Sequence, residues 1–325
     1  MKKTYFITGG TGSFAKKLIR HLLKNNLSKK IIIFSRDEYK QLQLKEDSLI
    51  NKNLSKMRFL IGDVRDEDRV NFAIQDNIDV VIHAAAMKQV PATEYNPFEA
   101  VKTNIFGAKN IIESCIKKNI KKIIALSTDK AAAPINLYGA TKLTSDKLFI
   151  NANFFKGKAR CKFSVVRYGN VMGSRGSVIP LFLKQKKDNK IFTITDTDMT
   201  RFNITLNESV KFVLNCEKVM HGGEIFVPKI PSYKILDLLK AISKNYKYKL
   251  IGIRAGEKLH EELITESDSL NVLEFKNYYI IQSSYKKNNK KYKKIFSYNS
   301  KENKKFLTPQ EIKKLIESNI GDFEK

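Results

Sequence analysis

Six short runs of apolar residues recur in the first half of the chain, and longer segments with helical periodicity separate them. The runs occupy residues 5–7, 31–34, 57–61, 80–82, 123–126 and 163–166. A short, continuously apolar run is typical of a strand buried on both faces, as in a parallel sheet covered by helices. Such strands in alternation with helices predict an α/β fold built on a doubly wound parallel sheet.

The regular alternation ends near residue 168, where loops rich in glycine and proline begin. We expect residues 1–167 to form a Rossmann-type dinucleotide-binding domain that carries the catalytic motifs. Residues 168–282 are expected to form a smaller substrate-binding cap, interleaved with the first domain, with a helix near residues 235–244.

Residues 283–325 form a lysine-rich tail. Its first part, residues 283–305, combines lysine with asparagine and predicts a mobile surface segment, in which Tyr292 and Phe296 could pack locally. The sequence Thr-Pro-Gln-Glu from Thr308 onward is typical of a helix N-terminus and predicts a final helix.

The formal net charge of +27 raises nucleic acid and anionic membranes as candidate partners. The lysines, however, are spread along the whole chain, and their densest run, residues 286–305, lacks a glycine-aromatic RNA-binding signature. We therefore interpret the charge as a solvated surface and predict neither a nucleic-acid partner nor membrane attachment.

The three cysteines, Cys115, Cys161 and Cys216, are widely separated and form no Cys-x-x-Cys pair. Neither a disulfide framework nor a zinc site is indicated. The N-terminus runs straight into the first apolar strand, too short for a signal peptide, and no apolar stretch reaches transmembrane length. These features predict a soluble, cytoplasmic protein.

Three histidines invite a metal-site interpretation, which their spacing does not support. His83 follows an apolar strand and is expected to be a hydrogen-bonded structural residue. His221 and His260 lie in predicted loops without metal-ligand spacing. We predict no metal.

A glycine-rich turn follows the first strand and opens a helix. The spacing Gly9-x-x-Gly12-x-x-Ala15 puts backbone without side chains at a helix N-terminus, where a pyrophosphate can approach the amides. Ala15 stands where a third small residue is needed for close packing. The turn predicts cofactor contacts from Gly9, Thr11, Gly12, Ser13 and Phe14.

The second strand ends in Ser35 and Arg36, where a dinucleotide fold places the residues that contact the adenosine ribose. A hydroxyl and a guanidinium suit a 2′-phosphate, so NADP is favoured over NAD, with Lys40 as a further contact. The adjacent Asp37 and Glu38 leave open the alternative of a surface arginine beside two acids.

Two weaker signals follow the third and fourth strands. Asp63 and Val64 would supply a contact to the adenine edge, and the small side chain of Ala84 would let the backbone pass close to the cofactor. Their order along the chain supports a dinucleotide site.

Tyr138 and Lys142 lie four residues apart and therefore on one face of a helix. A nearby ammonium and a positively charged nicotinamide could lower the pKa of the tyrosine enough for it to act as a base. This pair alone is common by chance. Its significance comes from a polar segment that directly follows the fifth strand, at the carboxyl end of the sheet.

That segment contains Thr128, Asp129 and Lys130. Thr128 can hydrogen-bond a sugar hydroxyl, and Asp129 can protonate a leaving hydroxide. Lys130 can take or give a carbon-bound proton if desolvation keeps it partly neutral.

With these motifs the chain resembles the extended short-chain dehydrogenase/reductase superfamily. Within it, the chain is most similar to the inverting UDP-N-acetylglucosamine 4,6-dehydratases that open pseudaminic-acid synthesis. The resemblance covers about residues 4–262. It is carried by the segments TGGTGSFA, FSRDE, IGDVRD, HAAAMKQVP, YNPFEAVKTNIFGA, ALSTDKAAAPINLYGATK, SVVRYGNVMGSRGSVIP, MTRF, HGGEIFVPKIPS and IGIRAGEKLHEE.

The resemblance implies a role for each matching position. The catalytic set would be Thr128, Asp129, Lys130, Tyr138 and Lys142, of which Tyr138 and Lys142 also contact the cofactor. The nicotinamide side would be lined by Lys88, Thr103 and Asn104. The UDP-sugar would be held by Lys88, Asn170, Ser174, Val178, Arg201, Arg254 and Glu257.

The resemblance also implies an outcome at C5 of the sugar. Retaining dehydratases carry a glutamate after the Thr-Asp pair, whereas this chain has Lys130, as the inverting enzymes do. Inverting relatives that feed N-acetyl-fucosamine-type sugars usually lack the tyrosine, so Tyr138 points to the pseudaminic branch. Larger membrane-bound relatives carry transmembrane helices ahead of this domain, and this chain begins at the first strand.

Two other functions are compatible with parts of the sequence. A nucleotide-sugar 4-epimerase shares the fold, the cofactor and the tyrosine base, but does not require the Asp129-Lys130 pair. A non-catalytic Rossmann protein that senses NADP(H) would not require Tyr138 and Lys142 to be intact. We expect an NADP-dependent dehydratase that binds UDP-N-acetylglucosamine and forms a homo-oligomer.

Overall fold

The computed structural model of the chain describes residues 2–174, 176–283 and 295–322, and its main element is a nine-stranded sheet. Six neighbouring strands of this sheet are parallel: β1 (Lys3–Thr8), β2 (Ser28–Ser35), β3 (Met57–Ile61), β4 (Val80–His83), β5 (Lys122–Thr128) and β6 (Lys162–Tyr168). Each coincides with one of the six predicted apolar runs. The doubly wound α/β fold is confirmed.

The sheet continues beyond β6 with three strands from the later part of the chain. β9 (Glu224–Pro228) pairs in parallel with β6, while β14 (Tyr278–Gln282) and β13 (Val272–Glu274) add antiparallel. The complete order is β13-β14-β9-β6-β5-β4-β1-β2-β3. The stretch expected to form the cap therefore also contributes strands to the main sheet.

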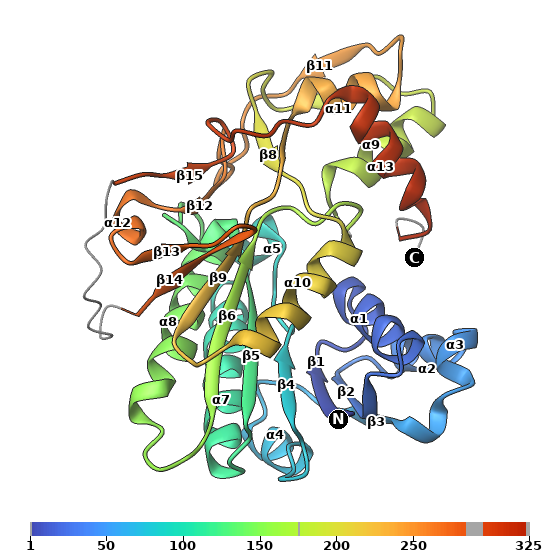
Figure 1. Cartoon of the computed structure of the whole chain (residues 1–325). Helices are drawn as coiled ribbons and strands as arrows, with labels where there is room; N and C mark the ends of the chain where they lie inside the picture. Colours follow the sequence, from blue (N-terminus) through green and yellow to red (C-terminus); the bar gives the residue numbers. More distant parts are fainter. Residues whose placement is uncertain (1, 175, 284–294, 323–325) are drawn as a thin grey trace.

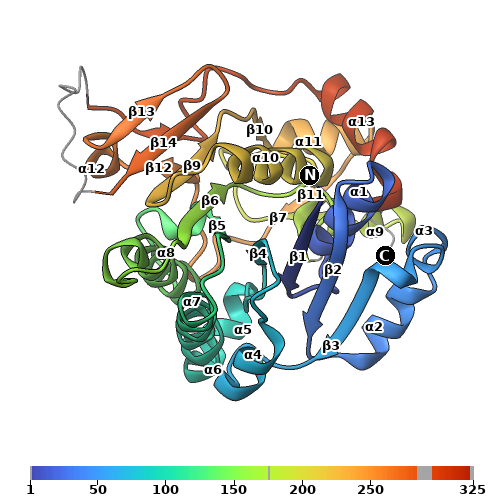
Figure 2. The same ribbon diagram turned by 60° about the horizontal axis from the view of Figure 1, so that its bottom comes forward.

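Helices cover both faces of the sheet (Figure 2). α1 (Ser13–Lys24) and α10 (Leu206–Val219) pack on one face, and α4 (Glu67–Ala73), α7 (Gly107–Lys117) and α8 (Leu137–Phe155) pack on the other. The shorter elements near them are α2 (Glu38–Lys45), α3 (Ser48–Asn51), η1 (Leu54–Lys56), α5 (Val90–Tyr95), α6 (Pro97–Val101), η2 (Lys102–Phe106) and η3 (Asp129–Ala131). Leu18, Ile19 and Leu22 of α1 are buried, as its amphipathic pattern predicts.

A second hydrophobic core lies above the carboxyl ends of the parallel strands (Figure 1). The elements in this part of the fold are α9 (Val178–Lys187), β7 (Phe192–Ile194), β8 (Thr200–Phe202), β10 (Ser232–Lys234), α11 (Ile235–Ile242), β11 (Tyr248–Leu250), α13 (Pro309–Ser318) and η4 (Ile320–Asp322). The predicted helix at residues 235–244 is α11. The predicted final helix is α13, which begins with a reciprocal capping box between Thr308 and Glu311.

The prediction of a mobile surface segment at residues 283–305 is wrong for its second half. β15 (Tyr298–Asn299) pairs with β12 (Glu262–Ile264), which α12 (Glu266–Ser269) follows. Phe296 packs against Tyr279 at 5.7 Å between ring centroids, and the hydroxyl of Tyr298 donates to the carbonyl of Ile230 at 3.0 Å. The contacts of these two aromatic residues hold residues 295–305 against the fold in spite of their polar composition. Residues 284–294, with Tyr292, lie outside the described residues.

The three cysteines are buried and free, and burial raises the pKa of each thiol. Across the residues that the structure describes, no helix is both long enough and apolar enough to cross a bilayer.

Candidate active site

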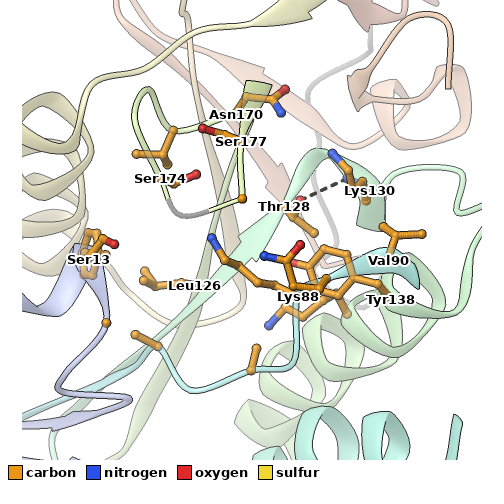
Figure 3. A pocket seen from close by; sticks show the side chains of 18 of the residues that line it. Ser13, Lys88, Val90, Leu126, Thr128, Lys130, Tyr138, Asn170, Ser174 and Ser177 are labelled. Atoms are coloured by element: carbon orange, nitrogen blue, oxygen red, sulfur yellow. Dashed lines mark hydrogen bonds between the residues drawn. The ribbon is translucent and has the colours of Figure 1, made fainter. Parts of the chain in front are cut away.

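A cavity of about 710 Å³ lies at the carboxyl ends of the parallel strands, between the main sheet and the second core. Every predicted site residue except Asn104 lines it. Figure 3 shows Thr128, Lys130 and Tyr138 grouped on one side of this cavity and Ser13 on the other. The cavity is therefore the place where the predicted cofactor, catalytic and substrate-binding residues meet.

The glycine-rich turn presents the N-terminus of α1 to the cavity. Gly9 has a φ of +62°, and a Cβ atom there would stand 2.9 Å from the backbone nitrogen of Ala85. Only glycine fits both constraints. Gly12 begins α1 without a side-chain cap, and the first turn contains no acidic residue. This arrangement leaves the positive end of the helix available to a diphosphate, so the residues fit a dinucleotide cofactor.

Thr8 and His83 hold the neighbouring loop in place. The hydroxyl of Thr8 accepts hydrogen bonds from the backbone N–H groups of Ala84 and Ala85 at 3.1 and 3.2 Å, and bonds Nδ1 of His83 at 2.9 Å. Burial, with the charge of Lys142, lowers the pKa of His83 to about 3, so the imidazole is neutral. The structural role predicted for His83 is confirmed.

The carboxyl end of β2 carries the residues expected to contact the ribose. Asp37 accepts from the backbone N–H of Lys40 at 2.9 Å as the N-cap of α2, and also pairs with the Lys40 ammonium at 2.6 Å. Arg36 is largely exposed and lies 3.6 Å from Asp63. Gln41, which the sequence did not single out, donates to the hydroxyl of Ser35 at 2.9 Å. Asp37 is thus engaged by its own helix, while Arg36 remains at the cavity.

The catalytic segments come from two elements that pack closely. Thr128 ends β5, Asp129 and Lys130 form the turn η3, and Tyr138 and Lys142 lie in the first turns of α8. A Cβ atom on Gly139 would overlap the carbonyl oxygen of Lys130. Glycine after Tyr138 therefore lets α8 approach η3 and brings the tyrosine beside the polar turn.

Lys130 bridges two carboxylates. Its ammonium lies 3.1 Å from Oδ1 of Asp129 and 3.0 Å from Oε1 of Glu261, and the hydroxyl of Thr128 donates to the same Asp129 oxygen at 2.8 Å. Asp129 and Glu261 are buried, with only 1% and 2% of their side chains exposed. Glu261 also lies 3.8 Å from Nε of Arg201.

The electrostatic surroundings differ from the predicted ones at two positions. Burial alone would lower the pKa of Lys130, but the charges of Asp129 and Glu261 outweigh it and raise the pKa. The expectation of a partly neutral lysine is therefore wrong for the ion-paired state. Burial raises the pKa of Tyr138 to about 12, opposed by Lys130 and by a hydrogen bond with Thr128. The ammonium that opposes the rise is thus Lys130, not Lys142 as predicted.

Burial, followed by the charge of Glu261, raises the pKa of Asp129 in spite of its pairing with Lys130. A carboxyl group that retains its proton at higher pH is suited to act as a general acid. This agrees with the acid role that the sequence analysis expects of Asp129.

Lys142 lines the cavity and also belongs to a network of buried charged residues that includes Asp146 and Arg167. Burial lowers its pKa, and Asp146, one helical turn further along α8, opposes the shift. Asp146 accepts from the hydroxyl of Ser127 at 2.7 Å and lies 3.4 Å from the guanidinium of Arg167. The network fixes the face of α8 that carries the catalytic pair.

Asn104 supports the cavity without lining it. Its side chain donates to the carbonyl of Met87 at 2.9 Å and to the hydroxyl of Thr141 at 3.0 Å, and accepts from the N–H of Met87 at 2.8 Å. Asn104 therefore differs from the expectation in that it does not line the cavity, because its amide is committed to Met87, next to Lys88, and to Thr141. The neighbouring Thr103 does line the cavity.

The predicted UDP-binding residues come from the later segments. Arg201 on β8 is buried, donates to the carbonyls of Thr200 and Leu259 at 2.8 and 2.9 Å, and lies 3.4 Å from Glu257. Arg254 is exposed, and its carbonyl accepts from the N–H of Glu257 at 3.0 Å. The remaining predicted members that line the cavity are Lys88, Asn170, Ser174 and Val178. Two guanidinium groups at one cavity suit a diphosphate.

Among the described residues, no group of three or more His, Cys, Asp or Glu side chains could hold a metal ion. His260 instead bonds the hydroxyl of Thr200 at 2.8 Å.

Comparison with known proteins gives matches over most of the chain. Residues 5–283 match the family described as polysaccharide biosynthesis protein. A UDP-N-acetylglucosamine 4,6-dehydratase (inverting) from Campylobacter jejuni subsp. jejuni is 52% identical over an alignment of 334 residues, which covers 98% of this chain and 98% of that protein.

Two further relatives bear on the function and the fold. A UDP-glucose 4-epimerase from Rickettsia bellii is 46% identical over 287 residues, which cover 86% of this chain and 82% of that protein. The X-ray structure of Pen from Bacillus thuringiensis is similar with a TM-score of 0.90 and 41% identity, and the match covers 98% of each chain.

Proposed function

The chain belongs to the polysaccharide biosynthesis protein family, and from this premise we propose that it is a UDP-N-acetylglucosamine 4,6-dehydratase that inverts C5. The product would be UDP-2-acetamido-2,6-dideoxy-β-L-arabino-hex-4-ulose. The observation that carries the proposal is the contact between Asp129 and Lys130 beside Tyr138. Dehydration needs an acid and a base at C6 and C5 in addition to the tyrosine that acts at C4.

A nucleotide-sugar 4-epimerase is the second candidate, because the Rickettsia bellii relative carries a 4-epimerase name. Epimerisation at C4 requires no group that removes the C5 proton and none that protonates a leaving 6-hydroxyl. This chain places both, Lys130 and Asp129, in the cavity at 3.1 Å from each other. We therefore favour dehydration.

In the proposed cycle, Tyr138 takes the proton of the sugar 4-hydroxyl, and Thr128 beside it hydrogen-bonds that hydroxyl. A nicotinamide dinucleotide, when bound, supplies the hydride chemistry that oxidises C4 and later reduces C6. The 4-ketone acidifies the hydrogen on C5, so elimination becomes accessible to a side-chain base.

Lys130 and Asp129 share one mobile proton in the elimination. Its transfer from Nζ of Lys130 to the Asp129 carboxylate gives a neutral amine and a carboxylic acid. The amine takes the C5 proton, the electrons of the C5–H bond form the C5=C6 double bond, and the C6–O bond breaks as Asp129 protonates the departing hydroxyl to water. The step regenerates the ammonium-carboxylate pair seen at 3.1 Å. Once C6 has been reduced, a proton from solvent adds to C5 on the face opposite Lys130 and gives the inverted product. The proton that Tyr138 took from the 4-hydroxyl returns to solvent.

The test of this function is incubation of the purified protein with UDP-N-acetylglucosamine, followed by mass spectrometry and NMR of the product. We expect loss of one water without stoichiometric added NADP, because the hydride removed from C4 returns to C6. In deuterated water, C5 should gain deuterium and the couplings should report the L-arabino configuration. An isomer of unchanged mass would support the epimerase instead, and a D-xylo product would contradict inversion.

We also propose that the cofactor is NADP rather than NAD. Asp37, the acid best placed to accept from a free ribose 2′-hydroxyl, is engaged as the N-cap of α2 and by Lys40. Arg36 and Lys40 offer two cations at the same edge of the cavity, which suits a 2′-phosphate.

Replacing Arg36 with alanine should weaken NADP binding by about 10- to 100-fold, as expected for loss of one charge-assisted contact of about 1.5–3 kcal/mol. Binding of NAD should change little. Calorimetry with both cofactors measures the difference, and Arg58→Ala, on β3 outside the cavity, serves as the control. Equal losses for the two cofactors would contradict the assignment of Arg36.

We further propose that the protein forms a homo-oligomer and that it is located in the cytoplasm. Its product would enter pseudaminic-acid synthesis. Three aromatic side chains near one another in sequence are strongly exposed, Tyr95 at 89%, Phe98 at 78% and Phe106 at 53%. Exposed apolar side chains of this size are typical of an interface. The free thiols favour a reducing compartment. The mass of the native protein in solution tests the oligomeric state.

A further inference from the structure

Glu261 is a buried acidic residue at the site that the motif analysis does not identify. It immediately precedes β12, and only 2% of its side chain is exposed. Its backbone is held on both sides by Ser300, whose hydroxyl accepts from the Glu261 N–H at 2.9 Å and whose N–H donates to the Glu261 carbonyl at 2.7 Å. The carboxylate is therefore presented to the cavity from a fixed backbone.

The polar contacts of this carboxylate are made by one oxygen. Oε1 accepts from the ammonium of Lys130 at 3.0 Å and lies 3.8 Å from Nε of Arg201. Oε2 is buried and, among the described residues, has no hydrogen-bond partner. The same holds for Oδ2 of Asp129, the other carboxylate on Lys130. Burying a charge with unsatisfied oxygens is costly, so an ordinary stabilising ion pair does not account for this arrangement.

We propose that Glu261 is a positioning residue for the dehydration: its carboxylate holds the Lys130 ammonium against Asp129 and leaves Asp129 as the carboxyl that carries the transferable proton. This inference rests on the proposed function and adds a residue that acts through Lys130 and Asp129.

The charges around the two carboxylates explain why the transferable proton of Lys130 goes to Asp129 rather than to Glu261. Among the described residues, Glu261 pairs with two cations, Lys130 and Arg201, whereas Asp129 pairs with one cation, Lys130, and faces the charge of Glu261. Burial opposes ionisation of Glu261, but Lys130 and Arg201, with a smaller contribution from Lys258, lower its pKa. Burial and Glu261 together raise the pKa of Asp129. Glu261 therefore remains ionised while its neighbour takes the proton.

The same oxygen of Glu261 also connects the chemistry with a predicted UDP contact. Oε1 lies 3.0 Å from Lys130 and 3.8 Å from Arg201, which in turn lies 3.4 Å from Glu257. A neutral residue at position 261 would remove one of the two carboxylates that fix the Lys130 ammonium and would leave Arg201 with one carboxylate fewer.

The test is Glu261→Gln in the full-length chain with its cofactor, which keeps the shape of the side chain and removes its charge. We expect kcat for water loss to fall by about 10- to 100-fold, the effect of losing one charged hydrogen bond, with little change in KM or in cofactor affinity. The alkaline limb of the kcat profile should move to lower pH, because Asp129 would lose its proton more readily. Because Asp129 and Lys130 titrate together, the pKa that the alkaline limb reports belongs to this pair rather than to one residue.

Two matched variants separate positioning from mere structural support. Glu261→Asp restores the charge and should recover part of the activity and the original pH limb. Glu262 is the adjacent carboxylate; it accepts from the Ser297 hydroxyl at 2.6 Å and does not line the cavity. The variant Glu262→Gln should therefore behave as wild type. If Glu261→Gln does not fold, the pH limb of Glu261→Asp decides: a wild-type limb supports the proposal and a displaced limb contradicts it.

Wild-type protein assayed in parallel keeps the two proposals distinguishable. If wild type removes water and Glu261→Gln retains its kcat and its pH profile, only the role of Glu261 is refuted. A fall in kcat with an unmoved limb and no recovery in Glu261→Asp would indicate a structural role and also refute it. If wild type removes no water, the proposed function fails, and the role of Glu261 in dehydration falls with it.

Discussion

Replacing Lys130 with alanine should lower turnover of UDP-N-acetylglucosamine by about 10²- to 10⁴-fold, the range for loss of a general acid or base. In the proposed cycle Lys130 acts after C4 has been oxidised. The variant should therefore still form the 4-ketone, and reduced nicotinamide should accumulate in a single turnover. Stopped-flow absorbance follows the nicotinamide, and NMR in deuterated water should find no deuterium at C5.

A second lysine variant controls for a general effect of charge. Lys147 lies on α8, is exposed and does not line the cavity, so Lys147→Ala should retain wild-type turnover. Lys130→Ala should also bind the cofactor normally, since Lys130 contacts carboxylates rather than the glycine-rich turn. Deuterium at C5 at the wild-type rate in Lys130→Ala would contradict its assignment as the C5 base.

The elements that position the site could be predicted because their signals are local. The apolar run at residues 57–61 and the strand Met57–Ile61 coincide, and the polar segment from Thr128 to Lys130 lies at the end of β5 as expected. Both arguments need only a continuous apolar run and the rule that parallel strands present their carboxyl ends at one edge. The same rule placed the glycine-rich turn beside the catalytic segment.

The charge state of Lys130 could not be predicted in this way. The local sequence offers Asp129 as its neighbour, but the second carboxylate, Glu261, lies 131 residues further along the chain. That residue reaches the site because β12 pairs with β15 and because Ser300 holds its backbone. No spacing in the sequence connects Lys130 with Glu261, so the second carboxylate that holds the lysine in its charged form could not be foreseen.

The errors at Asn104 and in the tail have a related origin. Asn104 stands beside the cavity-lining Thr103 in the π-helical turn Lys102–Phe106, and its amide bonds Met87 and Thr141 instead of lining the cavity. In the tail, the packing expected of Phe296 is confirmed by its contact with Tyr279, but the lysine-rich composition obscures Tyr298, whose partner Ile230 lies in another segment. In both cases the outcome depends on tertiary contacts rather than on a local pattern.

Replacing Tyr138 with phenylalanine should stop the cycle at its first step. The phenol oxygen is the group that takes the proton of the 4-hydroxyl, and the ring itself fills buried space that phenylalanine preserves. We expect turnover to fall by about 10²- to 10⁴-fold without loss of folding. Unlike Lys130→Ala, this variant should form no reduced nicotinamide in a single turnover, because C4 oxidation itself is blocked.

The pH dependence of C4 oxidation provides the second measurement. Burial raises the pKa of Tyr138 to about 12, so the fraction of tyrosinate grows as the pH rises toward that value. The single-turnover rate of C4 oxidation in wild type should therefore increase with pH, and Tyr138→Phe should lose this dependence. Tyr168, which also lines the cavity, is the rival base. If Tyr168→Phe blocks C4 oxidation while Tyr138→Phe retains it with the wild-type pH profile, the base has been assigned to the wrong tyrosine.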